Sequence, residues 1–259
     1  MTNESTPRSV LIAEGIRKTY SSHQNAQNVL NGIDLRVTEG EFIGIMGPSG
    51  SGKTTLLNTL ATIDRATDGK VFINDYEITA MKDRKLSNIR REHLGFIFQD
   101  YNLLDTLTVK ENILLPISLT PITNSQAERA FHDIATMLEI EELANKYPSE
   151  ISGGQKQRTS AARALIHSPS IVFADEPTGA LDSKAASNLL DNLYEINQLR
   201  KVTIVMVSHD PLASSYCSRV VFLHDGHVYS ELYRGDKTRD AFFKDILDMQ
   251  AVLGGGHVR

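Results

Sequence analysis

Along the chain, segments whose hydrophobic residues are contiguous or alternate are followed by segments whose hydrophobic residues recur every three or four positions. Short apolar runs and partly alternating segments predict β-strands at 11–16, 29–37, 42–46, 70–74, 95–99, 170–174, 202–207 and 219–229, the last broken at Asp225-Gly226. Apolar residues three or four positions apart predict helices at 53–63, 154–166, 184–199 and 240–252. Strands that alternate with helices favour an α/β fold with a mostly parallel sheet and right-handed crossovers.

A long central stretch departs from this alternation. Residues 103–142 have a mainly helical pattern that is interrupted at Pro116 and Pro121, because proline lacks the N–H that a helix interior requires. We expect this stretch to form an inserted helical subdomain. The turn Glu39-Gly40 and the polar segment 21–28 separate the amino-terminal strands.

The composition narrows the class of protein. A length of 259 residues and a hydrophobic fraction of 41% are sufficient for one compact domain, with or without a helical insertion. A formal net charge of -5 argues against broad electrostatic binding to nucleic acid, so we expect no nucleic-acid partner. Cys217 is the single cysteine, which excludes an internal disulfide and favours a reduced, cytosolic protein.

The sequence does not predict a membrane-embedded segment. The first ten residues are polar and lack the basic start and apolar core of a signal peptide. The apolar stretches 113–119 and 202–207 are far shorter than the roughly 18 residues that suggest a spanning helix. If the protein works at a membrane, we expect another protein to anchor it.

A phosphate-binding loop follows the apolar run 42–46. The segment fits the pattern G-x-x-x-x-G-K-[ST] and reads Gly47-Pro48-Ser49-Gly50-Ser51-Gly52-Lys53-Thr54. Its glycines let backbone N–H groups approach a triphosphate, and Lys53 adds a positive charge. We expect Thr54 to bind Mg²⁺ and Thr55 to bond a nearer phosphate. The alternative, a glycine-rich turn before an unrelated helix, is strongly disfavoured by this context.

Two carboxylates end a buried strand further along the chain. Asp175 and Glu176 follow the apolar run 171–174, and the carboxyl edge of a parallel sheet is where ligands bind. We expect Asp175 to hold Mg²⁺, directly or through water. Glu176 is the candidate base that polarises the attacking water. The alternative is an ordinary strand end with solvated acids.

A second candidate anion site precedes these carboxylates. The segment Ile151-Ser152-Gly153-Gly154-Gln155 opens a predicted helix, where backbone donors are free to bind phosphate. Taken alone, it would be read as a helix N-cap and turn. If it binds phosphate instead, one chain carries two phosphate sites for one nucleotide.

On these motifs the chain resembles the ATP-binding cassette (ABC) family over nearly its whole length. The resemblance implies a P-loop NTPase cassette with a mostly parallel central sheet, an antiparallel β subdomain and an inserted α-helical subdomain. The core and antiparallel subdomain would take residues 10–98 and 165–235, the helical subdomain 100–164 and a helical tail 236–259. It also implies that Ser152, Gly153, Gly154 and Gln155 bind the γ-phosphate of ATP held by a second copy.

Four single residues gain candidate roles only through this resemblance. Gln99 matches the glutamine that senses Mg²⁺ and contacts the membrane partner, and His209 matches the switch histidine at the γ-phosphate. Tyr20 matches the aromatic residue that stacks on adenine, and Asp182 matches the loop that links the two sites across the dimer. Their plainer readings are a solvated glutamine, a structural histidine, a core tyrosine and a helix N-cap.

Longer segments narrow the resemblance to one group of cassettes. Residues 96–112 and 174–184 look like lipoprotein-release and peptide-resistance cassettes, and the tail at 242–246 and 252–255 looks like the bacitracin-resistance type. This likeness implies an ATPase at the cytoplasmic face of the membrane, bound to an integral membrane permease that removes cell-wall-targeting peptides such as bacitracin or lantibiotics. A sensor histidine kinase would act through the permease. The segment Gln99 to Leu115 of this chain would dock the permease.

Two other functions remain as alternatives. Within the family, the chain could drive lipoprotein release or transmit force in cell division. From another class, it could be a soluble ABC ATPase of DNA repair or translation. The chain has one copy of the segment 151–155, one phosphate loop, no zinc-binding pattern and an acidic net charge, and these features disfavour the last function.

Overall fold

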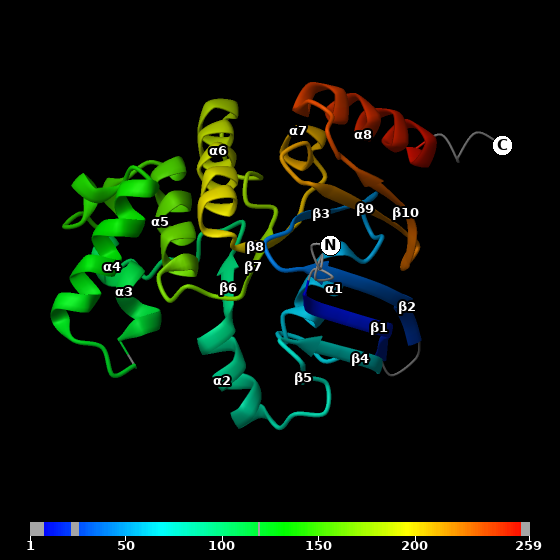
Figure 1. Cartoon of the computed structure of the whole chain (residues 1–259), viewed down its shortest axis with the longest axis horizontal. Helices are drawn as coiled ribbons and strands as arrows, with labels where there is room; N and C mark the ends of the chain where they lie inside the picture. The colour runs from blue at the N-terminus through cyan, green and yellow to red at the C-terminus, as the bar shows by residue number, and fades with distance from the viewer. Residues whose placement is uncertain (1–7, 22–25, 119, 255–259) are drawn as a thin grey trace, which may run out of the picture.

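The computed structural model describes residues 8–21, 26–118 and 120–254 and contains two β-sheets (Figure 1). The larger sheet has six strands in the order β10, β9, β3, β8, β7, β6. Strand β10 is antiparallel to β9, and every other neighbouring pair is parallel. The strands are β3 (Phe42–Met46), β6 (Leu94–Ile97), β7 (Ile171–Asp175), β8 (Thr203–Val207), β9 (Arg219–His224) and β10 (His227–Tyr233). The mostly parallel sheet expected from the sequence is therefore confirmed.

Both faces of this sheet are covered, which explains why its central strands are continuously apolar. In β8, Ile204 and Met206 pack into one hydrophobic cluster, and Val205 and Val207 pack into another. The first cluster includes α5 (Gly153–Leu165), α6 (Ser183–Arg200) and α8 (Arg239–Gly254). The second includes α1 (Lys53–Leu60), α2 (Asp83–His93) and the smaller sheet.

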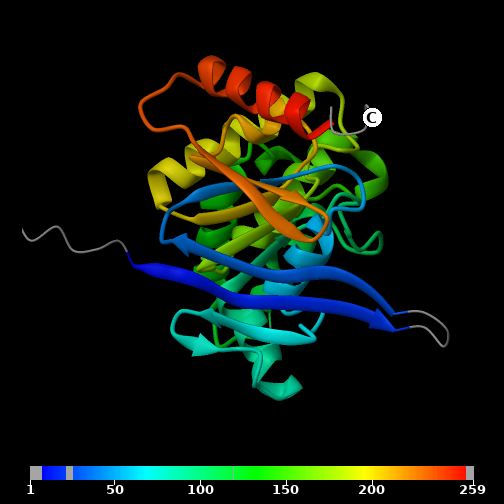
Figure 2. The same ribbon diagram turned by 90° about the vertical axis from the view of Figure 1, so that its right-hand side faces the viewer.

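The smaller sheet is antiparallel throughout, in the order β2, β1, β4, β5. Its strands are β1 (Ser9–Ser21), β2 (Ala26–Thr38), β4 (Asp68–Ile73) and β5 (Tyr76–Glu77). Figure 2 shows β1 and β2 as a long hairpin that crosses the molecule beside β4. The hairpin is longer than predicted, because the ends of the polar segment 21–28 join the strands; residues 22–25 lie outside the described residues.

The helical subdomain lies to one side of the larger sheet, at the left of Figure 1. It contains α3 (Val109–Leu114), α4 (Asn124–Met137), α5 and short 3-10 turns at Leu115–Ile117, Glu141–Leu143 and Pro148–Glu150. Capping boxes at Thr108 and Thr123 start α3 and α4. The predicted breaks at Pro116 and Pro121 are present, since Pro116 lies in a 3-10 turn and Pro121 in a bend before α4, whereas residues 103–108 are irregular rather than helical.

Three elements were not predicted. Helix α2 escaped because its sequence is highly charged and only Leu86 and Ile89 are buried, so no apolar stripe marks it. Strand β5 and helix α7 (Pro211–Ser214) are too short to show a period. The predicted strands and helices are present; β3 has the predicted ends, and most of the others have shifted ends. Gln99, for example, lies beyond β6 rather than in it.

The part of the chain that the structure describes was also searched for membrane spans. No helix within it combines the length and the apolar composition needed to cross a bilayer.

Candidate nucleotide-binding site

The loop between β3 and α1 requires glycine at two positions. A Cβ on Gly47 would lie 2.2 Å from the carbonyl oxygen of Leu223, and one on Gly52 would lie 2.9 Å from that of Val29. Gly52 is the N-cap of α1 and makes no side-chain capping bond. The first-turn N–H groups of α1 are thus free for an anion, and the helix dipole favours negative charge there.

Lys53 places a positive charge in this loop. Its Nζ donates to the carbonyl oxygens of Gly47 and Pro48, both at 2.9 Å. Burial lowers the pKa of Lys53, and the nearby carboxylates of Glu176 and Asp175 oppose that shift. The ammonium group lines a hollow of about 550 Å³ together with Gly47, Pro48, Ser49, Glu176 and His209. The loop's carbonyls and these two carboxylates keep the cation beside the free N–H groups.

The acidic pair lies where β7 ends. Thr54 Oγ1, in the first turn of α1, lies 3.4 Å from Asp175 Oδ1. Burial raises the pKa of Asp175, and the contact with Thr54 opposes the rise. Glu176 adopts a left-handed backbone conformation with φ 45°. For a residue other than glycine this conformation costs about 1–2 kcal/mol, so the surrounding structure must impose it.

His209 faces Glu176 from the turn after β8. Its Nδ1 lies 3.0 Å from Glu176 Oε1, and its backbone N–H donates to Oε2 at 3.4 Å. The side chain of Glu176 is 16% exposed and that of His209 is 73% exposed. The carboxylate is thus held in a partly buried position while the imidazole faces the hollow. The structure therefore brings Lys53, Thr54, Asp175, Glu176 and His209 together at the carboxyl ends of β3, β7 and β8.

These groups fit a magnesium ion that also has phosphate ligands. The Thr54 hydroxyl and the Asp175 carboxylate supply hard oxygen donors. Gln99 is exposed after β6, with its amide close to Gly179, and no hydrogen bond joins it to Thr54 or Asp175 in the described part of the chain. Within the described ranges, no three His, Cys, Asp or Glu side chains gather as a metal site. A bound Mg²⁺ would need substrate oxygens and water.

Tyr20 lies at the far end of β1, with 45% of its surface exposed. Its hydroxyl donates to Asp64 Oδ2 at 2.7 Å, and Lys18 Nζ donates to Asp64 Oδ1 at 2.6 Å. Burial alone would raise the pKa of Asp64, but the bonds from Lys18 and Tyr20 lower it. Asp64 could not be predicted as the partner of Tyr20, because 44 positions separate the two residues.

The phosphate loop and the first turn of α1 contain three further residues with predicted contacts to phosphate. Ser51 is buried, the Cβ position of Gly50 has no neighbour within 4 Å, and Thr55 follows Thr54 in the first turn of α1.

The second candidate anion site, the signature segment Ile151-Ser152-Gly153-Gly154-Gln155, is separate from these groups. Ser152 is the N-cap of α5, with its Oγ accepting from the N–H of Gln155 at 3.3 Å while Gln155 Oε1 accepts from the N–H of Ser152 at 2.9 Å. Gly153 and Gly154 form the first turn of α5. Asp182 caps α6 by accepting from Ala185 N–H at 2.9 Å and lines the same hollow of about 150 Å³. That hollow shares no lining residue with the one at Lys53.

Gln157, which sequence reasoning missed, ties three of these segments together. Its buried Nε2 donates to Phe98 O at 3.0 Å and to Pro177 O at 2.7 Å, so α5 holds both the turn before Gln99 and the turn after Glu176. Arg163 donates to the carbonyl oxygens of Tyr101 and Asn102. The sequence contained one signal of this role: Gln157 lies on the same helix face as the apolar residues Ala161 and Ala164, where a polar side chain is unusual.

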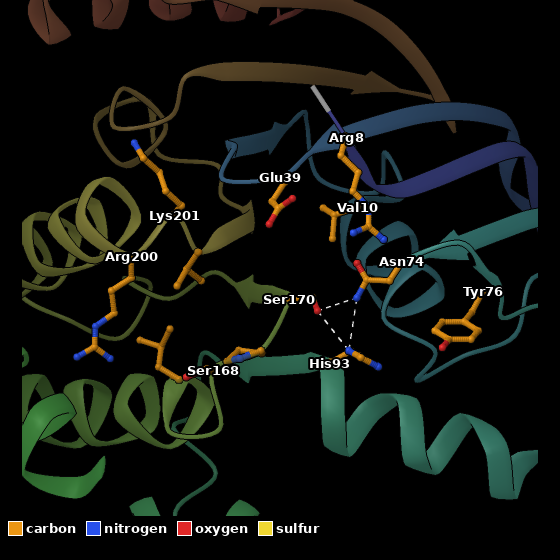
Figure 3. A pocket seen from close by; sticks show the side chains of 13 residues that line it. Arg8, Val10, Glu39, Asn74, Tyr76, His93, Ser168, Ser170, Arg200 and Lys201 are labelled. Carbon is orange, nitrogen blue, oxygen red and sulfur yellow. Dashed lines mark hydrogen bonds between the residues drawn. The ribbon is translucent and has the colours of Figure 1, made fainter. Parts of the chain in front are cut away.

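A hollow of similar size, about 540 Å³, lies at the opposite edge of the sheet (Figure 3). There Asn74 Nδ2 donates to Ser170 Oγ at 2.7 Å, His93 Nδ1 lies 3.3 Å from the same oxygen, and Arg8 pairs with Asp75 at 2.9 Å. Helices α2, α5 and α6 end near this hollow, and helix C-termini carry partial negative charge. Arg8, Arg200 and Lys201 line it as well, so it is a basic hollow, but it has neither the free helix N-terminus nor the acidic pair found beside Lys53.

Comparisons with known proteins give a consistent result. The family model described as ABC transporter matches residues 30–179. The chain is 59% identical over 246 residues to the bacitracin export ATP-binding protein BceA of Halalkalibacterium halodurans, covering 95% of this chain and 97% of that protein. It is 38% identical over 215 residues to the lipoprotein-releasing system ATP-binding protein LolD of Bacteroides fragilis, covering 83% and 98%.

A solved structure has the same fold. It is the dimeric post-hydrolysis state of the cassette MJ0796, from Methanocaldococcus jannaschii, bound to ADP and Pi. The match has a TM-score of 0.79 and 36% identity and covers 86% of this chain and 98% of that one.

Proposed function

The chain belongs to the ABC transporter family and is an ATP-binding, ATP-hydrolysing subunit, and we propose that it powers a membrane permease that removes cell-wall-targeting peptides such as bacitracin. The observation that carries the choice of cargo is the 59% identity to the bacitracin export protein over nearly the full length of both chains. The lipoprotein-release alternative is supported less, because that relative is 38% identical. The chain itself would lie at the cytoplasmic face of the membrane, attached through the permease.

The proposal includes a second copy of the chain. The loop at Lys53 and the signature at Ser152 line two separate hollows with no lining residue in common, which supports phosphate contacts to two different ATP molecules. Two copies placed head to tail would each lend a signature to the ATP bound by the other. The dimeric state of the related cassette supports this arrangement.

Hydrolysis would proceed at the carboxyl ends of β3, β7 and β8. The free N–H groups of α1 and Lys53 bind the phosphates, and Tyr20 offers an exposed ring for adenine to stack on. Thr54, Asp175 and Gln99 would hold Mg²⁺, which offsets phosphate charge when bound. Water attacks the γ-phosphorus, its proton passes to Glu176, and the bond to the bridging oxygen breaks to release ADP. His209 would keep Glu176 in place through its Nδ1, and it lines the hollow in which the γ-phosphate would lie.

A groove of about 340 Å³ beside Gln99 is the proposed docking site of the permease. Its lining combines three cations with apolar side chains: Arg90, Arg91 and Arg163 with Phe96, Phe98, Leu115 and Pro116. A helical segment with apolar and acidic side chains would match this lining. Its movement would reach the nucleotide through the Phe98–Asn102 turn, which Gln157 and Arg163 bind to α5.

The docking proposal is tested by charge reversal at an exposed arginine of the groove. Arg91→Glu should weaken assembly with the permease and lower peptide resistance while basal ATPase activity stays near wild type. Lys244→Glu, an equal charge change on the exposed face of α8, is the control. Full resistance and normal assembly of the Arg91→Glu complex would refute the docking site.

The cargo is tested in the native host. Deleting the protein should increase sensitivity to bacitracin or a lantibiotic, and wild-type protein should restore resistance while Glu176→Gln should not. A reporter for a peptide-responsive histidine kinase should lose its response in the deletion. Unchanged peptide sensitivity together with retained lipoproteins at the inner membrane would instead support the lipoprotein-release function.

A further inference from the structure

The last turns of the carboxyl-terminal helix α8 reach the nucleotide hollow. Gln250, Leu253 and Gly254 line it together with Lys53, Glu176 and His209. The Gln250 side chain donates from Nε2 to the backbone carbonyl oxygen of His209 at 3.2 Å. Helix α8 thus bonds the turn that carries His209 through a residue 41 positions further along the chain.

Helix α8 is anchored firmly enough to act as a fixed support. Phe242 and Ile246 are fully buried in the hydrophobic cluster that includes Tyr216 and Phe222, and Met249 and Leu253 pack partly against it. The spacing of these four residues puts them on one helix face. Arg239 lies over the ring of Tyr216, 4.4 Å from its centroid. The fold therefore fixes the position from which Gln250 donates.

The His209 ring depends on hydrogen bonds rather than on packing for its position. Its side chain is 73% exposed, so few neighbours restrict its rotation. Its own N–H and Nδ1 contact Glu176, and its carbonyl oxygen is the acceptor for Gln250. Loss of the Gln250 bond would free one side of this residue and loosen the ring against Glu176.

We propose that Gln250 is a positioning residue that holds His209 against Glu176 from helix α8. The inference rests on the proposed roles of Glu176 and His209 in hydrolysis. Gln250 does not bond the nucleotide in this account. Its removal should therefore lower kcat and leave the KM for ATP unchanged.

The test compares donor and non-donor side chains of similar length at position 250 in the full-length protein. Gln250→Met and Gln250→Glu lack the amide donor and should lower kcat about 2- to 10-fold, the effect of one net hydrogen bond. Gln250→Lys keeps a long donor and should retain more than half of the wild-type kcat. Lys244→Gln, on the exposed face of α8, makes the same charge change as Gln250→Glu and should have no effect.

The outcomes separate this inference from the proposed catalytic roles. Glu176→Gln and His209→Ala are assayed beside the Gln250 variants, with thermal unfolding as a check on folding. If both lose turnover while Gln250→Met keeps wild-type kcat, the positioning role is wrong and the catalytic roles stand. If both keep turnover, the catalytic roles themselves are wrong. A Gln250→Met variant that raises KM at constant kcat, or that Gln250→Lys fails to rescue, would also overturn the inference.

Discussion

The two helix N-termini with candidate phosphate roles, those of α1 and α5, are built differently. Helix α1 starts at Gly52 without a side-chain cap, with Lys53 in its first turn and Asp175 and Glu176 close by. Helix α5 starts at Ser152, whose hydroxyl and backbone N–H form a closed capping box with Gln155. The N-terminus of α1 therefore has free N–H donors next to charged side chains, whereas the N-terminus of α5 satisfies part of its own hydrogen bonding.

In the proposed function, this difference corresponds to a division of work between two copies. The α1 end has the charge, the acids and the hollow that the proposed binding and hydrolysis of ATP require. The α5 end has no acidic residue in its first turn and a smaller hollow, but the Ser152 hydroxyl that accepts from Gln155 still has a proton to donate. Such a group adds a contact to phosphate held elsewhere. Changes at α1 should therefore affect binding or chemistry directly, and changes at α5 should act through association.

The largest effect is expected at the acid beside α1. Glu176→Gln removes the proton acceptor while keeping the shape, and should lower kcat for ATP about 10²- to 10⁴-fold without weakening ATP binding. Steady-state ATPase assays and nucleotide titration measure both. Glu195→Gln, on the exposed surface of α6, is the control. Near-normal turnover in Glu176→Gln would remove Glu176 from its role as base.

A somewhat smaller effect is expected at Lys53. Lys53→Ala removes a charge that would bond phosphate and should raise the Kd for ATP about 10- to 100-fold, the range for a hydrogen bond to a charged group. Lys244→Ala, an exposed lysine of α8, should bind ATP as wild type does. Fluorescent nucleotide titration measures the Kd. Equal affinities would contradict the assignment of the phosphate loop.

At the α5 end, Ser152→Ala should separate capping from phosphate binding when compared with Thr123→Ala. Each removes a capping-box hydroxyl, so each should lower the free energy of unfolding by about 1 kcal/mol. Only Ser152→Ala should also weaken ATP-dependent association of two copies. Urea unfolding and sedimentation measure the two quantities. If both variants associate normally, the signature is only a helix cap.

The smallest effect concerns Asp175 in protein without nucleotide. Burial raises the pKa of Asp175 in the folded protein, so the folded state binds this proton more tightly than the unfolded state does. The free energy of unfolding therefore falls as pH rises from the ordinary carboxyl pKa through the raised pKa of the folded state. Asp175→Asn should therefore stabilise the protein near pH 7, and this gain should vanish as pH falls below the ordinary carboxyl range. Urea unfolding across pH gives the curve. A gain that persists at low pH would show that burial of the charge is not the cause.

The sequence could predict the local motifs, because contiguous residues carry their chemistry. The phosphate loop, the acidic end of β7 and the cap at Ser152 follow from residues next to one another. The contacts made by Asp64, Gln157 and Gln250 could not be predicted, since each joins segments far apart in the chain. Helix α2 was missed for another reason: tertiary packing holds it through only two buried side chains.

The division of work between the two helix ends is tested most directly by the mass of Glu176→Gln protein in solution. With saturating Mg²⁺ and ATP, sedimentation should show the 28.7 kDa chain converting to a species of twice that mass, and Ser152→Ala in the same background should reduce the conversion. A protein that stays at 28.7 kDa at saturating ATP when alone, and that binds its permease as a single copy, would contradict the account.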